Sequence, residues 1–499
     1  MTMLISPTTM RALEQERIAS GTPAAVLIRT AGVACATAIF SRYPAIRRIL
    51  VCAGPGNNGA DALVCAASIA RQGVNVTVVT WHRPLSDEWL KYASRDGIEH
   101  IENWDLLAIE TLLPHVDLVV DGLLGIGLNR PPNDALAALC ETLNARRPRL
   151  PLVSIDIPSG CSALDGSIPG VAVRADLTLS TGPRKHGVHL LPTSQLTGSI
   201  VDLDIGISIP AYDRRATRLL DAPTVATMLP ERPIDSYKGT YGIVCVWAGS
   251  LQFPGAAHLA SLATARTGAG IVTLAGAPAA LPLAWPTPEV TLAPFAEDPL
   301  AVLVQSHFTS YLIGPGIGRS PETATLLHDF LTSPDVAGRP VVLDADALTL
   351  LARIPDWSQH ISALPCVLTP NYGELRRLAG GACIDLPPIP MAQHYAKTWG
   401  QVVVMKGSVT VIASPDGRTS LWAHPNPTLA IGGSGDVLAG IIAGLIAQHC
   451  DLYSAACAGV AIHGMAGAQV GHTHGNGGVL AGDVIACIPR VLSSLAALR

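Results

Sequence analysis

A glycine-rich segment late in the chain carries the clearest chemistry. Gly432, Gly433, Ser434, Gly435 and Asp436 follow one another and open an apolar stretch that is typical of a helix. Glycine amides at a helix N-terminus attract anions, so we expect this loop to hold a transferring phosphoryl group. Asp436 is placed to accept the proton of a hydroxyl that attacks phosphorus. The alternative is a tight turn in which Asp436 only complements the helix dipole.

Other polar residues and glycines follow short apolar runs in the same half. Lys406 comes directly after Val402–Met405, and Asn371 follows Cys366–Leu368. Lys406 is placed to meet nucleotide phosphates as a point charge, although a lone lysine before a turn is also common on solvated surfaces. Three further segments contain Ala256, Gly318, and Leu343 to Leu348. Together, all these segments indicate a site assembled from several strand ends.

A second glycine loop, Gly54 to Gly59, follows the apolar run Ile49–Ala53. Its G-x-G-x-x-G spacing matches dinucleotide-binding Rossmann domains, so a generic dehydrogenase has to be considered. Against that class, the next strand is followed by Thr80-Trp-His-Arg83, without an acidic residue for a ribose hydroxyl. Asn57, Asn58 and Asp61 are also unnecessary for a simple pyrophosphate cradle.

Oxygen donors end two further strands of the first half, in Asp121-Gly-Leu-Leu-Gly125 and in Asp156-Ile-Pro-Ser159-Gly160. Parallel strands bring their carboxyl ends to one crevice. Asn58, Asp121 and Ser159 could therefore form an oxygen-only site that suits a hard cation. Alternatively, the two aspartates only cap the turns that follow them.

The elements that must position these residues are buried strands alternating with helices. Short runs rich in Val and Ile, each followed by glycine or proline and then a helix-like segment, indicate a parallel α/β architecture in both halves. Prolines and arginines between Ile209 and Pro233 place a boundary near residues 215 to 230, giving domains 1–220 and 221–499. The predicted strands are Ile49–Ala53, Val74–Thr80, Leu118–Asp121, Leu152–Ile157, Gly242–Ala248, Tyr311–Ile313, Val341–Leu343, Cys366–Leu368 and Val402–Met405.

The composition excludes several classes of protein. The chain has 499 residues, 49% hydrophobic and 14% charged, and a net charge of -5, which gives no general attraction to nucleic acid or anionic membranes. Eleven scattered cysteines without a C-x-x-C pair favour reduced thiols. Thr267–Pro288 is uncharged, but its four prolines are incompatible with a spanning helix. We expect a cytoplasmic protein that does not bind membranes or nucleic acid.

The three motifs of the first half together resemble the NAD(P)H-hydrate epimerase family, with its GPGNNGGDGLV, D-x-x-x-G-x-G and D-I-P-S-G patterns, over Met10 to Ile207. The resemblance implies a Rossmann-like three-layer domain that interconverts the R and S hydrates of NADH and NADPH (NADHX and NADPHX). It implies K⁺ held by Asn58, Asp121 and Ser159, and catalysis by Asp156. It also implies a hydrate site that includes Asp156 and the segments Asn57, Asn58, Gly59, Ala60, Asp61 and Gly125, Ile126, Gly127, Leu128, Asn129, Arg130, Pro131.

The second half resembles the ribokinase-like fold and, within it, the ADP- or ATP-dependent NAD(P)H-hydrate dehydratases, over Pro223 to Leu498. The resemblance implies phosphorylation of the S-hydrate, with ADP and Mg²⁺ as cosubstrates and Asp436 as the base. Small-molecule substrates and a homo-oligomer are expected. The implied hydrate site is Ala256, Gly318, Asn371 and Asp436, and the implied nucleotide site is Lys406, Gly407, Ser408, Val409, Thr410, Gly432, Gly433, Ser434 and Gly435.

The chain departs from both family patterns. Ala60 and Ala62 replace glycines, and a methyl group would cost about 1–2 kcal/mol if either position needed a left-handed backbone. Asn371 and Tyr372 replace a usual His-Pro pair, which puts substrate affinity in question more than reaction type. The competing hypothesis is a ribokinase-like small-molecule kinase with a non-catalytic, nucleotide-binding N-terminal domain.

Several histidines suggest metal binding, but their surroundings do not support it. His463, His472 and His474 lack a carboxylate or cysteine at ligand spacing, so we do not expect a metal there. We assign Lys185, His186 and His189 to a surface turn of the first domain.

Overall fold

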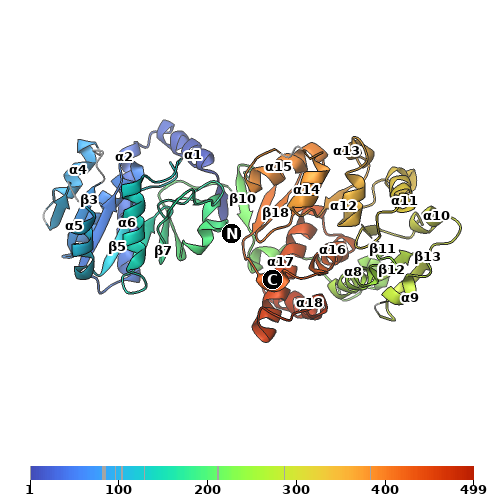
Figure 1. Cartoon of the computed structure of the whole chain (residues 1–499). Helices are drawn as coiled ribbons and strands as arrows, with labels where there is room; N and C mark the ends of the chain where they lie inside the picture. The colour runs from blue at the N-terminus through green and yellow to red at the C-terminus, as the bar shows by residue number, and fades with distance from the viewer. Residues whose placement is uncertain are drawn as a thin grey trace. The chain divides into compact units, whose positions relative to one another are not determined.

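The structure, a computed structural model, describes residues 2–80, 86–95, 97–102, 105–128, 130–210, 213–285, 287–381 and 384–499. The chain forms two compact units, residues 2–217 and 218–499 (Figure 1). Both units are α/β, as the sequence predicts.

The N-terminal unit is built on a parallel sheet with strand order β4-β3-β2-β5-β6-β7-β9. Alternate residues of its central strands face opposite layers, which is why these strands are apolar throughout. The strands are β2 (Arg48–Ala53), β3 (Asn75–Thr80), β4 (Ile98–Ile101), β5 (Leu118–Gly122), β6 (Leu152–Ile155), β7 (Leu177–Thr181) and β9 (Ser199–Leu203). A short parallel pair joins β1 (Met3–Ile5) to β8 (Arg184–Lys185).

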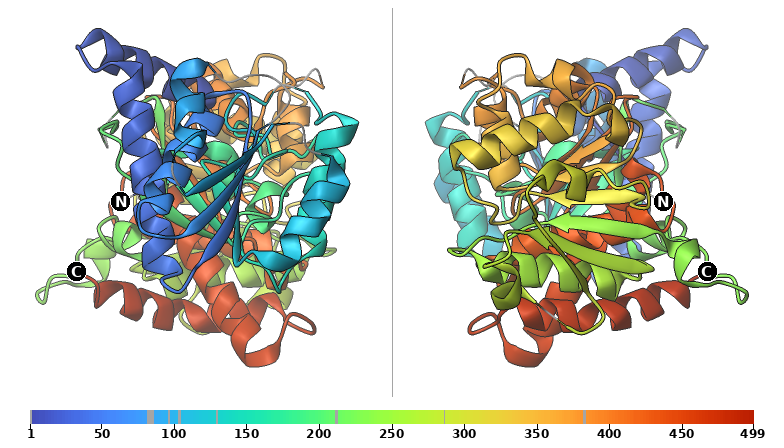
Figure 2. Two further views of the ribbon diagram at one scale, coloured as in Figure 1. Left: turned by 90° about the vertical axis from the view of Figure 1, so that its left-hand side faces the viewer. Right: turned by 90° about the vertical axis from the view of Figure 1, so that its right-hand side faces the viewer.

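Two hydrophobic clusters show that helices cover both faces of this sheet. Ile49 and Val51 pack in one cluster with α2 and α3, whereas Leu50 and Cys52 pack in the other with α5 and α6. Figure 2 (left) shows the strands between the two helix layers. The predicted three-layer domain is thus confirmed. Its helices are α1 (Pro7–Ala19), α2 (Ala24–Arg42), α3 (Asn57–Ala70), α4 (Asp87–Ala93), α5 (Leu106–Leu112) and α6 (Asp134–Ala145), with short 3-10 turns η1 (Leu113–His115), η2 (His186–His189) and η3 (Thr193–Gln195).

The C-terminal unit has the strand order β13-β12-β11-β14-β15-β16-β17-β18-β19-β10 (Figure 2, right). It is parallel from β13 to β17. Strand β18 runs antiparallel to both β17 and β19, and β19 pairs in parallel with β10. The strands are β10 (Ala216–Leu219), β11 (Ile243–Trp247), β12 (Ile271–Gly276), β13 (Thr291–Pro294), β14 (Ser310–Ile313), β15 (Val341–Leu343), β16 (Cys366–Leu368), β17 (Val402–Met405), β18 (Thr410–Ala413) and β19 (Thr419–Trp422).

The helices of this unit surround the sheet and include the longest helix described. They are α7 (Ala222–Ala226), α8 (Pro254–Thr267), α9 (Leu281–Ala284), α10 (Pro299–Leu303), α11 (Pro321–Thr332), α12 (Asp346–Leu351), α13 (Trp357–His360), α14 (Tyr372–Leu378), α15 (Pro388–Trp399), α16 (Ser434–Ala447), α17 (Leu452–His474) and α18 (Ala481–Ala496). Short 3-10 turns are η4 (Lys238–Tyr241), η5 (Pro334–Val336) and η6 (Pro427–Leu429).

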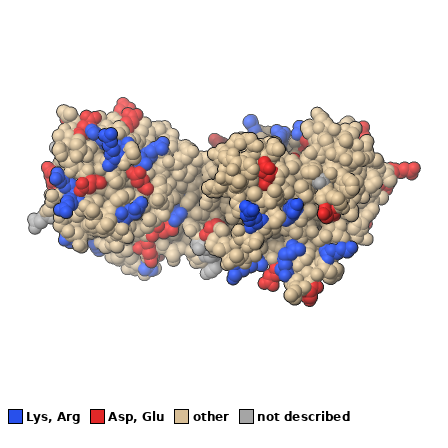
Figure 3. Space-filling model, turned by 90° about the horizontal axis from the view of Figure 1, so that it is seen from below, with Lys and Arg blue, Asp and Glu red and all other residues tan. Residues whose placement is uncertain are grey.

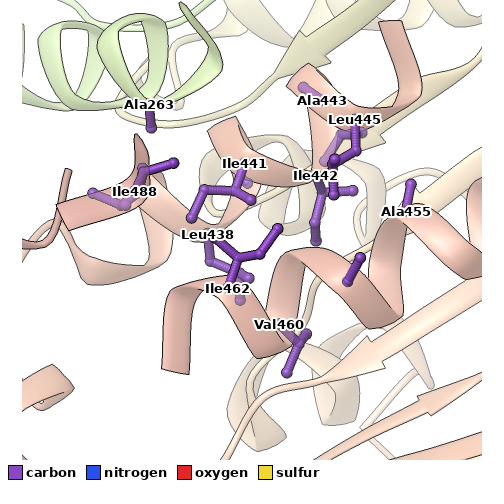
Figure 4. Close-up of a cluster of buried hydrophobic side chains, with 14 of the residues drawn as sticks. Ala263, Leu438, Ile441, Ile442, Ala443, Leu445, Ala455, Val460, Ile462 and Ile488 are labelled. Atoms are coloured by element: carbon purple, nitrogen blue, oxygen red, sulfur yellow. The ribbon is translucent and has the colours of Figure 1, made fainter. Parts of the chain in front are cut away.

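The core of the C-terminal unit lies where α16 packs against α8, α17 and α18. Leu438, Ile441 and Ile442 of α16 meet Ile462 of α17 and Ile488 of α18 (Figure 4). Glycines let α16 approach α8 closely, because a Cβ at Gly440 would lie 2.5 Å from the carbonyl oxygen of Ala260. The small residues of α16 therefore allow it to pack tightly against α8.

Two apolar segments resemble membrane spans by composition. Thr267–Pro288 contains strand β12 and the short helix α9. Among the described residues, helix α2 alone is long and apolar enough to cross a membrane, by length and composition only. A Cβ at Gly32 of α2 would lie 2.5 Å from Cβ of Val64 in α3, so this helix packs closely in the N-terminal core.

Candidate active sites

A cavity of about 460 Å³ lies at the carboxyl ends of β2, β5, β6 and β7 in the N-terminal unit. Its lining includes eight residues that the sequence singled out: Asn57, Asn58, Asp61, Gly125, Ile126, Gly127, Leu128 and Asp156. Gly59 and Ala60 lie in the first turn of α3 without lining it, and neither Arg130 nor Pro131 lines it. Asn129 lies outside the described residues.

The glycine loop and α3 create a close turn at the edge of this cavity. A Cβ at Gly59 would lie 1.8 Å from the carbonyl oxygen of Gly54, so a larger residue does not fit there. Ala60 and Ala62 lie inside the helix, and neither has a positive φ. The left-handed strain that their replacement of glycine could have caused is therefore absent.

Asn58, Asp121 and Ser159 meet around the backbone of Leu124. Asn58 Nδ2 donates to the Leu124 carbonyl at 3.0 Å, and the Ser159 hydroxyl donates to Asp121 Oδ1 at 2.6 Å. Burial raises the pKa of Asp121, although hydrogen bonds from Ser159 and Ser154 act to lower it. Asn58 Oδ1 is buried and has no hydrogen-bond partner. This set of oxygens, with one carboxylate and one unsatisfied amide oxygen, fits a hard cation of low charge.

Asp156 is held by a buried lysine, Lys185, for which the sequence predicts a surface turn. Lys185 is fully buried and forms an ion pair with Asp156, and it also donates to the Thr181 carbonyl at 2.8 Å. His186 is buried as well, and burial lowers its pKa to about 4. The surface-turn assignment is therefore wrong for both residues. The reason is that β8 (Arg184–Lys185) pairs with β1, which turns Lys185 inward toward the cavity.

Two more carboxyl groups, Asp61 and Glu14, line the same cavity. Burial raises the pKa of Asp61 well above its usual range, and the charges of Asp156 and Glu14 raise it further. Asp61 Oδ1 is buried without a hydrogen-bond partner. The three carboxyl groups share the cavity with two cations, Lys185 and Arg11. Because Lys185 forms its ion pair with Asp156, the protonated form of Asp61 is favoured.

A second cavity, of about 590 Å³, lies in the C-terminal unit. The residues predicted from the sequence that line it are Asn371, Lys406, Gly407, Ser408, Thr410, Ser434 and Gly435. Gly432, Gly433 and Asp436 belong to the same loop and helix start, but they are not lining residues, and neither is Val409. Gly433 has a φ of 84°, a left-handed backbone that favours glycine and lets α16 begin at Ser434.

Lys406 lies in a group of carboxylates at one wall of this cavity. Its Nζ donates to Asp344 Oδ1 at 2.7 Å and is 3.9 Å from Glu374 Oε2. Burial acts to lower the pKa of Lys406, but the attraction of Asp344 and Glu374 outweighs it, so the pKa is raised. Lys406 is therefore fully charged at neutral pH, which suits a phosphate-binding residue.

The surroundings of Asp436 raise the pKa of its carboxyl group. Burial, with repulsion from Asp344 and Asp346, raises its pKa to about 7, although Lys406 acts to lower it. A Cβ at the preceding Gly435 would lie 3.5 Å from Lys406 Nζ and 3.8 Å from Asp344 Oδ2. Asp436 thus lies in the first turn of α16, beside the Lys406–Asp344 pair, with a pKa close to that of an efficient general base.

Asn371, Gly318 and Ala256 occupy three different loops of this unit. Asn371 caps α14, accepting from the Glu374 amide at 2.9 Å, and its strand-like bridge to Lys406 brings the two loops together. The Gly318 amide donates to Asp346 Oδ2 at 3.0 Å. A Cβ at Gly316 would lie 2.8 Å from Cβ of Ala256. Only Asn371 of these three predicted residues lines the cavity.

Four polar residues near these cavities received no functional role from the sequence: Lys185, Asp344, Glu374 and His463. Asp344 directly follows a buried strand and Glu374 lies in the Asn371 segment, so strand-end position was a usable signal for both. Lys185 and His463 had no such signal, because an isolated lysine or histidine is more often solvated or structural.

The folds and cavities together define a two-domain α/β enzyme whose C-terminal half has the glycine–aspartate loop of a phosphoryl-transfer enzyme. The family described as NAD(P)H-hydrate dehydratase matches residues 244–490, and the family described as YjeF-related protein N-terminus matches residues 24–187. The crystal structure of a ribokinase-like superfamily protein from Enterococcus faecalis is similar, with a TM-score of 0.51 and 26% identity, covering 58% of this chain and 99% of that one.

Relatives resemble the chain over almost its full length. A bifunctional NAD(P)H-hydrate repair enzyme from Salinibacter ruber is 36% identical and covers 94% of this chain and 92% of its own length. A protein of the same description from Coxiella burnetii is 34% identical and covers 97% of this chain and 98% of its own. The chain therefore belongs to the family of bifunctional NAD(P)H-hydrate repair enzymes.

Proposed function

We propose that this chain repairs hydrated NADH and NADPH in two steps. Residues 1–220 interconvert the R and S hydrates at C6, and residues 221–499 dehydrate the S-hydrate with ADP as phosphoryl donor. Membership of the repair-enzyme family supports the pair of activities. The observation that carries the dehydratase assignment is the glycine loop at the start of α16, where Asp436 has its pKa raised to about 7 beside Lys406 and Asp344.

In the dehydratase, Asp436 accepts the proton of the C6 hydroxyl as that oxygen attacks the terminal phosphorus of ADP. The bond from phosphorus to the bridging oxygen breaks and AMP leaves. The C6–O bond then breaks with phosphate as leaving group, while C5 loses a proton, and the dihydronicotinamide ring is restored. Lys406, the other residues of 406–410 and the loop 432–435 hold the nucleotide, since their cation and amides attract phosphate oxygens. Ala256, Gly318 and Asn371 hold the hydrate.

The residues beside Lys406 also fit a divalent cation. Asp344 and Glu374 are carboxylates that lie within 4 Å of the Lys406 ammonium group. Carboxylate oxygens are the ligands that Mg²⁺ prefers. A nucleotide-bound Mg²⁺ would neutralise phosphate charge there, and these two carboxylates are the groups that would hold it.

In the epimerase, Asp156 serves as the proton-transfer group and Lys185 keeps it oriented. Asn58, Asp121 and Ser159 would hold K⁺, which would supply a fixed positive charge at the cavity wall. The buried, partnerless Asn58 Oδ1 supports this assignment. Asn57 to Asp61 and Gly125 to Pro131 would contact the hydrate.

The described cysteines are all free, which supports the expected cytoplasmic location. A homo-oligomer stays a prediction.

Recovery of reduced-nicotinamide absorbance from a mixture of R- and S-hydrates tests both activities. With ADP, Mg²⁺ and K⁺ we expect complete recovery, and without K⁺ we expect recovery to stop near the S fraction. Recovery of only the S fraction in every condition would contradict the epimerase. A stable phosphorylated product without recovered NAD(P)H would instead support a small-molecule kinase.

A further inference from the structure

His463 is a buried histidine that faces the proposed nucleotide loop. It lies within α17 among small and aliphatic residues, with an exposed fraction of 8%. Burying an imidazole in such a helix is costly unless its ring nitrogens are hydrogen-bonded. His463 Nε2 lies 3.1 Å from the hydroxyl oxygen of Ser434, the first residue of α16. Both residues line the same cavity as Lys406 and Gly435.

The imidazole is neutral at physiological pH. Burial lowers the pKa of His463 to about 4, and the nearby charge of Lys406 lowers it further, although a hydrogen bond with the backbone of Ser434 acts to raise it. A neutral imidazole carries a hydrogen on only one ring nitrogen, and a hydroxyl has one hydrogen and two lone pairs. The direction of the His463–Ser434 hydrogen bond therefore decides what Ser434 presents to the cavity.

The two possible directions have opposite consequences for an anion. If Nε2 carries the hydrogen, it donates to Ser434, and the hydroxyl hydrogen is free to donate to a phosphate oxygen. If Nε2 is unprotonated, the hydroxyl donates to the imidazole and presents only lone pairs, which repel phosphate. A bound nucleotide phosphate thus selects the Nε2–H tautomer.

We propose that His463 is a positioning residue that orients the Ser434 hydroxyl as a hydrogen-bond donor to a phosphate group of the bound nucleotide. This inference rests on the proposed nucleotide site. His463 supplies specificity for the phosphate without adding charge, whereas Lys406 supplies the charge.

The test compares Mg·ADP with adenosine, which lacks phosphate, by calorimetric titration of the full chain. His463→Leu removes the donor at Nε2, whereas His463→Gln keeps an N–H at about the same distance along the side chain. We expect His463→Leu to weaken ADP binding about tenfold or more and to leave adenosine binding unchanged, since a hydrogen bond to a charged group is lost. His463→Gln should recover most of the affinity. His474→Leu, an exposed residue of the same helix, is the control.

A double-mutant comparison separates positioning from packing. Ser434→Ala should weaken ADP binding as much as His463→Leu, and the double variant should be no weaker than either, because both remove one hydrogen bond. Equal losses for ADP and adenosine, or unchanged ADP affinity in His463→Leu, would overturn the role of His463 alone. Failure of the unaltered chain to bind ADP would overturn the nucleotide site itself, and this inference with it.

Discussion

At the scale of single residues, the surroundings of Asp436 prepare it for proton transfer. Burial and the repulsion of two nearby aspartates raise its pKa to about 7, so at neutral pH it is divided between its protonated and ionised forms. A general base must be ionised to accept a proton. The rate of S-hydrate dehydration at limiting substrate should therefore fall about tenfold per pH unit below about pH 7, as measured by phosphate release between pH 5 and 9.

The variant Asp436→Asn should lower dehydration by about 10²-fold or more and change the pH dependence of stability. The folded-state pKa is raised above the unfolded value, so the neutral carboxyl is compatible with folding at low pH, and stability is lost as pH rises through about 7. Removing the charge should raise the thermal midpoint at pH 8.5 more than at pH 5. The control Asp329→Asn removes an exposed carboxylate and should show no such difference. An equal shift at both pH values would contradict the raised pKa.

The buried Asp156–Lys185 pair should be sensitive to the loss of either partner. Lys185→Met leaves an uncompensated buried carboxylate, which costs about 3–5 kcal/mol, and it should abolish epimerisation while S-hydrate dehydration continues. The double variant Lys185→Met with Asp156→Asn should regain part of this stability, measured by urea unfolding of the N-terminal unit.

Arg184 provides a matched control for that experiment. It is the neighbour of Lys185, but its ion pair with Asp202 is partly exposed, and such pairs contribute about 0–1 kcal/mol. Arg184→Met should therefore change stability little. Similar losses of stability in Arg184→Met and Lys185→Met would show that burial of the Asp156–Lys185 pair has no special effect.

At the scale of elements, α3 explains how the chain accommodates the two alanines that depart from the GPGNNGGDGLV pattern. Ala60 and Ala62 have helical backbone, so their methyl groups favour the helix and cause no strain. Ala60→Gly should therefore destabilise the N-terminal unit by about 1 kcal/mol without increasing epimerisation. Ala70→Gly, at the last residue of α3, should cost less. Faster epimerisation by Ala60→Gly would contradict this interpretation.

At the scale of the whole molecule, acidic and basic side chains are interspersed on the face shown in Figure 3. The two compact units each have their own hydrophobic clusters and their own cavity. Residues 1–217 and 218–499, produced separately, should therefore both fold, as measured by cooperative thermal unfolding.

The separated pieces should also divide the activities. We expect K⁺-dependent epimerisation from the N-terminal piece and ADP-dependent dehydration of only the S-hydrate from the C-terminal piece. Adding the first piece to the second should restore recovery of both epimers. Loss of dehydration on separation, with folding retained, would show that the C-terminal unit depends on the N-terminal one.

The strands were predicted where apolar runs are uninterrupted. Val341–Leu343, Cys366–Leu368 and Val402–Met405 coincide with β15, β16 and β17, because strands buried on both faces need apolar residues at every position. Strand β12 was missed, since it lies in a segment rich in glycine and proline, where propensity is a poor guide. The predicted cavity residues Asn58, Asp156, Asn371 and Lys406 line their cavities.

By itself, the sequence determined the α/β class, the order of the two halves and the loops that carry the chemistry, because glycine loops and strand ends are local patterns. Tertiary structure alone decided which polar groups meet. Lys406 and Asp344 are separated by 62 positions, and Ser434 and His463 by 29. Such pairs depend on strand order and helix packing, which place distant segments side by side. Burial and these long-range partners then set the protonation states of Asp436 and His463. These states cannot be predicted from residue type and spacing alone.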